Sequence, residues 1–574
     1  MYTLKFIIAL QVSAFGFFSC YFDEPLPEES PSPSRFISAP PAQLCTTPVA
    51  APSENCSPSQ PDPAPSSPSP DPFDMPLTTA LQTIEGRLPP TWQSNDDRLL
   101  FGLTKGGPGE LHLLRNDLNI PSAPISHEAS SLSYLVHLSD IHIVDEESPS
   151  RAFSLASFSG TIYRRNESFT PQVLHAMIQT LNRFSAFRPF DFAALTGDLI
   201  DNRQANELDW FMQTIDGGWV NPDSGDDDDP IPGENNDPND PFFSEGLDSR
   251  VPWYSTTGNH DLLFIGNMST DTFVGDPTRS YSAKAVIPTC LESDEEAPRP
   301  HRCVVPPLSY YSMGWIPPDP QRRPIDKAQF ISRHLESTSH PNGHGFTPEN
   351  VAHNTGYWVA DPHPELPIRL IALDTVAPIG SEGILDRDQI DNFLIPELQR
   401  AQEDQMLVII LTHHPSIEIL RGWELRELLH QNPNVILHLA GHTHVHKIIP
   451  RPGDTPEAGY WEIQTASLID WPLQQRLLEV VDLGNGYGEI WSTVIDFEAA
   501  ENSLAAAGRF YTLFEKQDHT SLVVPGNGGQ STDRNTILRI AFPSWMLPKL
   551  DQLPKREPTS PLFQIARPQL PTTD

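Results

Sequence analysis

The sequence has few cysteines, few basic residues and, after its first segment, no long apolar run. Its 574 residues include five cysteines, which excludes a disulfide-dense scaffold, and none of the five has a metal-binding spacing. Lys and Arg number 37 against 75 Asp and Glu, giving a formal net charge of −38. Nucleic-acid binding needs basic residues along one face, so nucleic acid is disfavoured as a partner. No segment after residue 20 is apolar for the roughly 20 residues that a membrane-spanning helix requires.

Residues 1–20 have the features of a secretory signal peptide, with Lys5 followed by an apolar stretch from Phe6 to Phe18. Cys20 resembles the cleavage site of a bacterial lipoprotein and is therefore a lipidation candidate; ordinary signal cleavage nearby is the alternative. We expect an exported protein, either on the outer face of a bacterial membrane as a lipoprotein or in the periplasmic or extracellular space. Contact with a membrane is expected only through this N-terminal lipid anchor.

The remaining four cysteines form two local pairs that are disulfide candidates in an exported protein, Cys45 with Cys56 and Cys290 with Cys303. Residues 21–77 are rich in Pro and Ser. Such a segment buries too little apolar surface to offset its ordering entropy, so we predict a disordered linker there. Globular composition begins at about residue 78.

Five apolar runs with the composition of buried strands end in residues that can bind metal ions. They lead into Asp140 and His142, into Asp198, into Asn259 and His260, into His413, and into His442 and His444. Ligands of α/β sheets gather beyond the carboxyl ends of the strands, so the five runs predict one convergent site. Residues 171–187 carry apolar side chains at helical spacing, which predicts a strand–helix–strand unit between the first two runs.

The ordered set Asp-x-His, Gly-Asp-x-x-Asp, Gly-Asn-His-Asp, His-x-Pro and Gly-His-x-His, over residues 134–446, resembles the calcineurin-like metallophosphoesterases. The resemblance implies an α/β fold, a four-layer α/β/β/α sandwich, that holds two metal ions. It implies that Asp140, His142 and His444 bind one ion, that Asn259, His413 and His442 bind the other, and that Asp198 bridges them. His260 would face the substrate as the catalytic residue. Because Pro415 selects His413 as the ligand, His414 and His446 are expected to be neighbours of the site.

The expected phosphoesterase domain covers residues 78–500, and residues 501–574 form a C-terminal extension. An acidic insertion over residues 221–241 is interpreted as a solvated loop, because its spacing does not follow the calcium-binding EF-hand pattern. A second insertion, over residues 262–354, leaves directly from the Gly-Asn-His-Asp block. We predict that it is a cap that shapes substrate access; a structural elaboration elsewhere on the surface is the alternative.

The expected ligands include two carboxylates, so two divalent ions would leave a surplus of positive charge. That surplus should generate hydroxide from a bridging water and favour its in-line attack on the phosphorus of a small phosphomonoester or phosphodiester. The ligand set allows Mn, Fe or Zn. The Tyr of purple acid phosphatases is absent, because Leu199 follows Asp198. His260 would stabilise or protonate the leaving oxygen, and Asp261 is the candidate to orient an imidazole.

Two other classes of protein are alternatives. A metallo-β-lactamase-like hydrolase shares the His-x-His of His442 and His444, but His446 then breaks its pattern. An exported metal-binding or interaction module on a phosphoesterase scaffold that has lost catalysis is the other. Decayed sites usually lose a ligand or the catalytic His, and none is missing here, which favours an active enzyme.

Overall fold

The structure is a computed structural model that describes residues 78–86, 103–121, 129–148, 151, 163–225, 232–269, 282–286, 312–316, 318–500, 503–518 and 528–559. The predicted signal peptide, the predicted linker, all five cysteines and residues 226–231 of the acidic insertion lie outside these ranges. Within the described part of the chain, no helix is both long enough and apolar enough to cross a membrane.

A seven-stranded sheet contains the first three motif strands. Its strand order is β3 (Leu113–Arg115), β21 (Thr536–Ala541), β20 (Tyr487–Asp496), β19 (Gln474–Asp482), β4 (Ser130–Leu138), β5 (Phe192–Leu195) and β8 (Trp253–Ser255). β4, β5 and β8 run parallel, so their carboxyl ends lie at one edge of the sheet. The segment expected as a C-terminal extension supplies β21, which pairs with β20.

A six-stranded sheet contains the last two motif strands. Its order is β11 (Trp358–Ala360), β12 (Ile368–Ala372), β14 (Leu407–Leu411), β16 (Val435–Ala440), β18 (Tyr460–Gln464) and β17 (Lys447–Arg451). β12, β14, β16 and β18 are parallel, with β11 and β17 antiparallel at the edges. As in the other sheet, the parallel strands bring the residues that follow them to one edge.

The two sheets pack against each other around a shared apolar core. Leu407, Ile409 and Leu411 of β14 belong to the core cluster that also contains the apolar residues of β4 and β19. The alternate residues, Val408 and Ile410, pack instead with α8 (Ile395–Glu403) and its neighbours. This two-residue alternation explains why β14 reads as an unbroken apolar run: both of its faces are buried.

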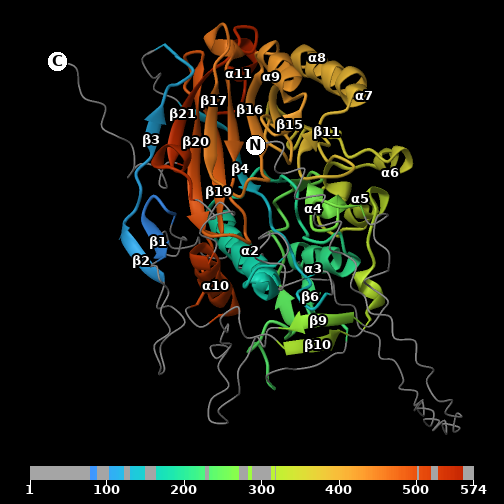
Figure 1. The fold of residues 1–574 in the computed structure, drawn as a ribbon. Helices are drawn as coiled ribbons and strands as arrows, with labels where there is room; N and C mark the ends of the chain where they lie inside the picture. Colours follow the sequence, from blue (N-terminus) through green and yellow to red (C-terminus); the bar gives the residue numbers. More distant parts are fainter. Residues whose placement is uncertain are drawn as a thin grey trace, which may run out of the picture. The chain divides into compact units, whose positions relative to one another are not determined.

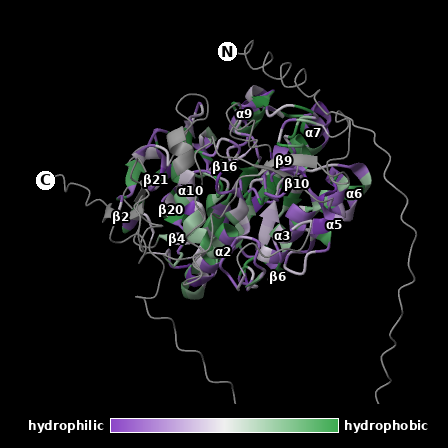
Figure 2. Cartoon of the chain, turned by 60° about the horizontal axis from the view of Figure 1, so that its bottom comes forward, coloured by the Kyte–Doolittle hydropathy of each residue, from purple (hydrophilic) through white to green (hydrophobic). Residues whose placement is uncertain are grey.

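Helices cover the outer faces and complete four layers, α/β/β/α (Figure 1). α2 (Thr170–Phe187), α3 (Ala205–Asp216) and α10 (Leu504–Asp518) lie on the side of the seven-stranded sheet. α7 (Arg387–Gln389), α8 and α9 (Gly422–His430) lie on the side of the six-stranded sheet. Figure 2 shows hydrophobic and hydrophilic residues together along α2, as expected for a helix with one buried face.

The insertions flank the sandwich. A hairpin of β6 (Gly218–Val220) and β7 (Phe242–Ser244) borders the acidic insertion. The second insertion contains the hairpin β9 (Ser282–Val286) and β10 (Ser312–Ile316), then α5 (Lys327–Leu335) and α6 (Pro348–His353). Its residues 318–354 pack beside edge strand β8, where His344 stacks on Trp253 with ring centroids 3.2 Å apart. That part of the insertion supports the sheet edge.

Candidate metal centre

Every predicted ligand follows a strand of one of the two sheets. Asp140 and His142 follow β4, Asp198 follows β5, Asn259 begins α4 (Asn259–Leu262) after β8, His413 follows β14, and His442 and His444 follow β16. The structure therefore brings together seven residues that are spread over more than half of the sequence. They form two adjoining groups.

The first group contains Asp140, His142, Asp198 and His444, whose ligand atoms face one another. Nε2 of His142 lies 3.1 Å from Nε2 of His444 and 3.6 Å from Oδ2 of Asp198. Nε2 of His444 lies 3.4 Å from Oδ1 of Asp140. Two imidazole nitrogens and two carboxylates that converge in this way fit the coordination of a divalent transition metal.

The second group shares Asp198 with the first. Oδ2 of Asp198 lies 3.2 Å from Nε2 of His413. Oδ1 of Asn259 lies 2.8 Å from Nε2 of His413 and 3.1 Å from Nδ1 of His442. One carboxylate between two sets of nitrogen and oxygen donors is the geometry that a bridging ligand requires.

Backbone strain is concentrated at these ligands. Five of the seven have positive φ angles: Asp140, His142, Asp198, His442 and His444, with values between 51° and 69°. Left-handed backbone is costly for residues other than glycine and persists where surrounding structure enforces it, which occurs most often at functional sites. Here it turns side chains from strand ends toward a common point.

The nitrogens that face away from the centre have hydrogen-bond partners. Nδ1 of His142 lies 2.7 Å from Oδ1 of Asp201, Nδ1 of His413 lies 2.8 Å from the carbonyl oxygen of Thr196, and Nδ1 of His444 contacts Oδ2 of Asp470. An acceptor at Nδ1 holds the proton there and leaves the Nε2 lone pair directed inward. The tautomers are therefore those that metal ligation needs.

Two buried arginines connect these outer partners. Arg151 forms an ion pair with Asp201 and donates to Glu167. Nε of Arg164 donates to Oδ1 of Asp470 at 2.8 Å, and its Nη1 lies 3.6 Å from Oδ1 of Asp201. Sequence reasoning found no role for Arg151, Arg164 or Asp470, which lie outside the five blocks. Asp201 is the last residue of the Gly-Asp-x-x-Asp block. Its place in that block is the sequence feature that could have indicated its role beside the ligands.

His260 lies beside the first group. Its ring stands edge-on to His142, with centroids 4.6 Å apart, and its backbone N–H donates to Oδ1 of Asp198 at 2.7 Å. Its Nδ1 lies 2.8 Å from the carbonyl oxygen of Asp201. Burial lowers the pKa of His260, but the carboxylates of Asp198 and Asp201 outweigh burial and raise it overall. The ring can thus carry a proton at Nε2.

Asp261 has a different role from the one expected from sequence. Its carboxylate accepts hydrogen bonds from the backbone N–H groups of Asp198, Leu199, Ile200 and Gly258, at 2.7–3.1 Å. It fixes the loop that carries Asp198. Oδ1 of Asp201 instead faces Nδ1 of His142, and the carbonyl oxygen of Asp201 faces Nδ1 of His260.

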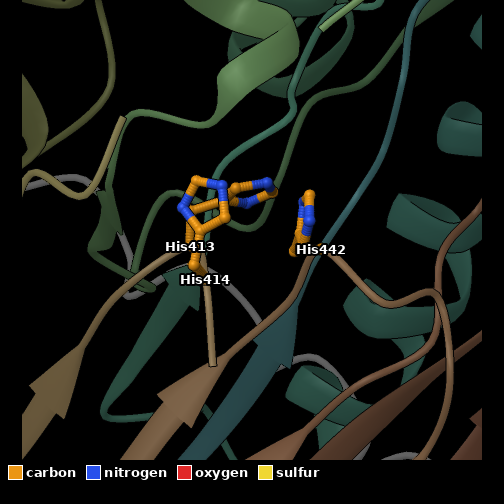
Figure 3. A group of neighbouring side chains, drawn as sticks. All are labelled: His413, His414 and His442. Atoms are coloured by element: carbon orange, nitrogen blue, oxygen red, sulfur yellow. The ribbon is translucent and has the colours of Figure 1, made fainter. Parts of the chain in front are cut away.

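His414 lies next to His413 and His442, and one ring nitrogen from each of the three lies within 4.8 Å of the others, so this trio could also hold a metal ion (Figure 3). Nδ1 of His414 contacts the Thr375 hydroxyl at 2.9 Å, and Nε2 lies 3.1 Å from the carbonyl oxygen of Ser381. Both ring nitrogens are therefore engaged in hydrogen bonds. These contacts hold the ring of His414 beside His413 and His442.

The protein's own charges favour positive charge at the centre. Burial lowers the pKa of His413, yet Asp198 and Asp140 raise it overall to about 9. Burial likewise opposes protonation of His444, and Asp470 and Asp140 raise its pKa to about 10. A metal ion would take the place of these protons, so the electrostatics fit cation binding.

Comparison with known proteins gives the following matches. The sequence model of the family described as calcineurin-like phosphoesterase matches residues 134–446. The chain is similar to a solved dimetal phosphatase from Danio rerio at 12% identity and a TM-score of 0.36, covering 64% of this chain and 100% of that one. It is also similar to the sulfate thiohydrolase SoxB of Thermus thermophilus, solved with glycerol, at 12% identity and a TM-score of 0.26, covering 70% of this chain and 63% of that one. No curated protein gives a match.

Proposed function

The chain belongs to the calcineurin-like phosphoesterase family, and on this premise we propose that it hydrolyses a small phosphoester at a centre of two divalent metal ions. Family membership makes it a hydrolase of phosphoester bonds. We assign Asp140, His142 and His444 to one ion, Asn259, His413 and His442 to the other, and Asp198 to both. The ions would be Mn, Fe or Zn, because the donors are imidazole, amide and carboxylate without thiolate.

The position of Asp198 carries this proposal. Its Oδ2 lies 3.6 Å from Nε2 of His142 and 3.2 Å from Nε2 of His413, so one buried carboxylate faces both ligand groups. A single-metal or purely structural site would not require a shared carboxylate. The backbone N–H of His260 and the loop held by Asp261 fix this carboxylate in place.

Two ions bound there would supply Lewis-acid chemistry, lowering the pKa of a water and attracting the phosphoryl oxygens. The protein's own residues supply the rest. The carbonyl oxygen of Asp201 accepts the Nδ1 proton of His260, which leaves Nε2 to carry the transferable proton. We assign to His260 the donation of that proton to the leaving oxygen as the bond to phosphorus breaks.

The test is hydrolysis and metal analysis on the full chain reconstituted with Mn, Fe or Zn. We expect two ions per chain and turnover of phosphomonoesters or phosphodiesters by the wild type. Asp198→Asn removes the shared charge and should lower both metal content and activity, the latter about 100-fold or more. Asp209→Asn changes a surface carboxylate that pairs with Arg333 on α5, and serves as the matched control.

Two results would contradict the proposal. A wild type that binds two ions but hydrolyses none of the esters would be a metal-binding module on a phosphoesterase scaffold. An Asp198→Asn variant with full metal content and full turnover would show that Asp198 does not join the two groups.

A further inference from the structure

We infer that four exposed apolar residues beside the metal centre bind an uncharged alkyl or aryl group of the substrate. These residues, here named the apolar rim, are Ile379, Ile417, Leu420 and Trp423. The inference rests on the proposed function and specifies its substrate class: a phosphoester whose other substituent is apolar. Such a substituent would lie on the rim while the phosphoryl group lies at the ligand groups.

The rim is a concentration of exposed large apolar side chains. Ile379 is 64% exposed, Ile417 56%, Leu420 65% and Trp423 60%. Single exposed apolar residues are ordinary on protein surfaces, but several on adjoining segments next to a candidate site mark a binding surface. The rim residues come from only two segments, 379–385 and 415–423.

Backbone pairing places these two segments side by side. β13 (Gly383–Ile384) runs parallel to β15 (Ile419–Leu420), with Gly383 opposite Ile419 and Ile384 opposite Leu420. The Gly383 N–H donates to the carbonyl oxygen of Glu418 at 2.9 Å. Ile379 and Ile417 precede these paired residues, and Leu420 and Trp423 lie at their far end. The rim therefore extends from one end of this short ribbon to the other.

The near end of the rim is continuous with the metal centre. Glu418, next to Ile417, has its Oε2 3.4 Å from Nε2 of His442. Ser381, two residues after Ile379, offers its carbonyl oxygen to His414 at 3.1 Å. The segment of Ile379 is also joined to the loop beside His260, because the Gly380 N–H donates to the carbonyl oxygen of Asn267 at 2.8 Å.

Charge near the rim argues against a second anionic group on the substrate. Glu418 and Glu382 lie on the two rim segments; Glu382 is exposed and Glu418 is half-buried. Two of the nearby arginines share one carboxylate: Arg387 donates to Glu424 at 2.7 Å, and Arg421 lies 3.6 Å from it. Nη1 of Arg426 donates to the carbonyl oxygen of Ser416 at 2.8 Å. A substituent with its own phosphate or carboxylate would meet negative charge, whereas a hydrocarbon would only bury apolar surface.

The experiment uses the metal-loaded full chain and a series of phosphoesters that differ only in one substituent: ethyl, butyl and octyl. Each methylene that becomes buried should increase kcat/KM by about two- to fourfold, mainly through KM. Binding of ethyl-, butyl- and octylphosphonate, measured by calorimetry, gives the same comparison without turnover. We expect a preference of octyl over ethyl of at least tenfold in both measurements.

Three variants locate the effect. Ile417→Ser, at the near end, should reduce the gain from ethyl to butyl. Trp423→Ser, at the far end, should reduce the gain in kcat/KM from butyl to octyl. It should leave the gain from ethyl to butyl unchanged. Trp219→Ser removes an aromatic residue that is 68% exposed on the β6–β7 hairpin, and should keep the whole chain-length preference.

The outcomes separate the inference from the proposed function. Turnover without a chain-length preference, or a preference that Ile417→Ser and Trp423→Ser leave unchanged, overturns the inference while the phosphoesterase function stands. A third result also overturns the inference: the wild type is a dimer that Trp423→Ser dissociates, and all chain lengths are turned over equally. The rim would then bind a second copy of the chain. No turnover of any ester, with no phosphonate binding, overturns both.

Discussion

Nδ1 of His142 lies 2.7 Å from Oδ1 of Asp201, and this contact determines which nitrogen of the ring faces the metal centre. Asp470 holds Nδ1 of His444 in the same way. Since Nε2 of His142 and Nε2 of His444 are 3.1 Å apart, both carboxylates direct a lone pair to the same point. Arg164, which donates to Asp470 and lies near Asp201, couples the two contacts electrostatically.

Asp470→Asn should weaken metal binding at the position of Asp140, His142 and His444. The neutral amide no longer holds the Nδ1 proton of His444 with a charge, and it leaves Arg164 with only the more distant carboxylate of Asp201. Loss of such a partner typically costs 10- to 100-fold in metal affinity. Metal content after dialysis against a graded chelator should fall from two ions toward one per chain.

Asp404→Asn is the control for Asp470→Asn, because Asp404 also accepts from an arginine, Arg369, but on the surface. It should keep both ions. Equal metal retention in the two variants would show that Asp470 does not position His444.

The convergence of the proposed ligands could be predicted from the sequence, whereas the positions of their hydrogen-bond partners could not, for a physical reason. Asp140, His142 and Asp198 directly follow strands, and strand ends meet at one sheet edge whatever the connecting loops do. Asp470 lies 26 residues beyond His444, in the loop after β18, and its position depends on how that loop folds over the site. Asp261 was misassigned because four backbone N–H groups compete for its carboxylate, and such contacts have no sequence signal.

His260→Ala should retain close to two ions per chain, because His260 is assigned to neither ion. Turnover of esters with poor leaving groups should fall by roughly 10²–10⁴, the usual scale for a positioned acid. The loss should be smaller for nitrophenyl esters, whose leaving oxygen needs less protonation. Kinetics and metal analysis on the same preparation make the comparison. His353→Ala, an exposed histidine on α6, should change neither quantity.

Either of two results would show that this role is wrong. Loss of metal in His260→Ala would make His260 a ligand or a support for one. Full turnover of an alkyl ester by His260→Ala would show that His260 does not donate the proton to the leaving oxygen.

The strand pattern predicted the central strands but not their partners. The alternation in β14 is visible in sequence because each face of the strand is buried against a different layer. Pairing of β4 with β19 joins Leu135 to Leu478, and pairing of β20 with β21 brings in residues beyond 535. Residues 536–541 have the composition of a strand, but long-range register depends on the whole sheet, so the pairing of β21 with β20 could not be predicted from the sequence.

Glu462 should make stability depend on pH below the usual carboxyl range. The buried side chain accepts from the backbone and hydroxyl of Ser416, and from Nε and Nη2 of Arg451, at 2.7–3.0 Å. Burial alone would raise the pKa of Glu462, but His438, Arg451 and Ser416 lower it well below its usual range. Its stabilising contribution is therefore complete above the unfolded pKa of about 4.3 and is lost as pH falls toward the folded value.

Glu462→Gln should lower the free energy of unfolding by about 3 kcal/mol at pH 7, because it removes the buried charge that pairs with the half-buried guanidinium of Arg451. The difference from wild type should shrink as pH falls below 4.3. Denaturant unfolding at pH 7 and near pH 3 measures both. Glu427→Gln, an exposed position on α9, should follow the wild type; a difference for Glu462→Gln that stays constant with pH would contradict the assignment.

Gly266 should be required for catalysis because its loop lies directly on His260. Its φ is +69°, and an added Cβ would lie 2.3 Å from Cδ2 and Nε2 of His260 and 2.6 Å from Nδ2 of Asn259. Gly266→Ala must therefore displace one or both side chains. A misplacement of about 1 Å can reduce turnover by about 100-fold, so we expect a loss of that order together with weaker metal binding at the position of Asn259.

Gly486→Ala separates this steric effect from backbone strain. Gly486 has a similar φ of +86°, but an added Cβ there would have Leu547 as its neighbour at an ordinary 3.7 Å. Both variants incur the cost of left-handed backbone, about 1–2 kcal/mol of stability, measurable by thermal unfolding. Only Gly266→Ala should also lose turnover and metal, since only there does the new methyl group meet the site. If both lose the same stability and both keep full activity, the loop of Gly266 does not fix His260, and the ring's position must come from Asp198 and Asp201 alone.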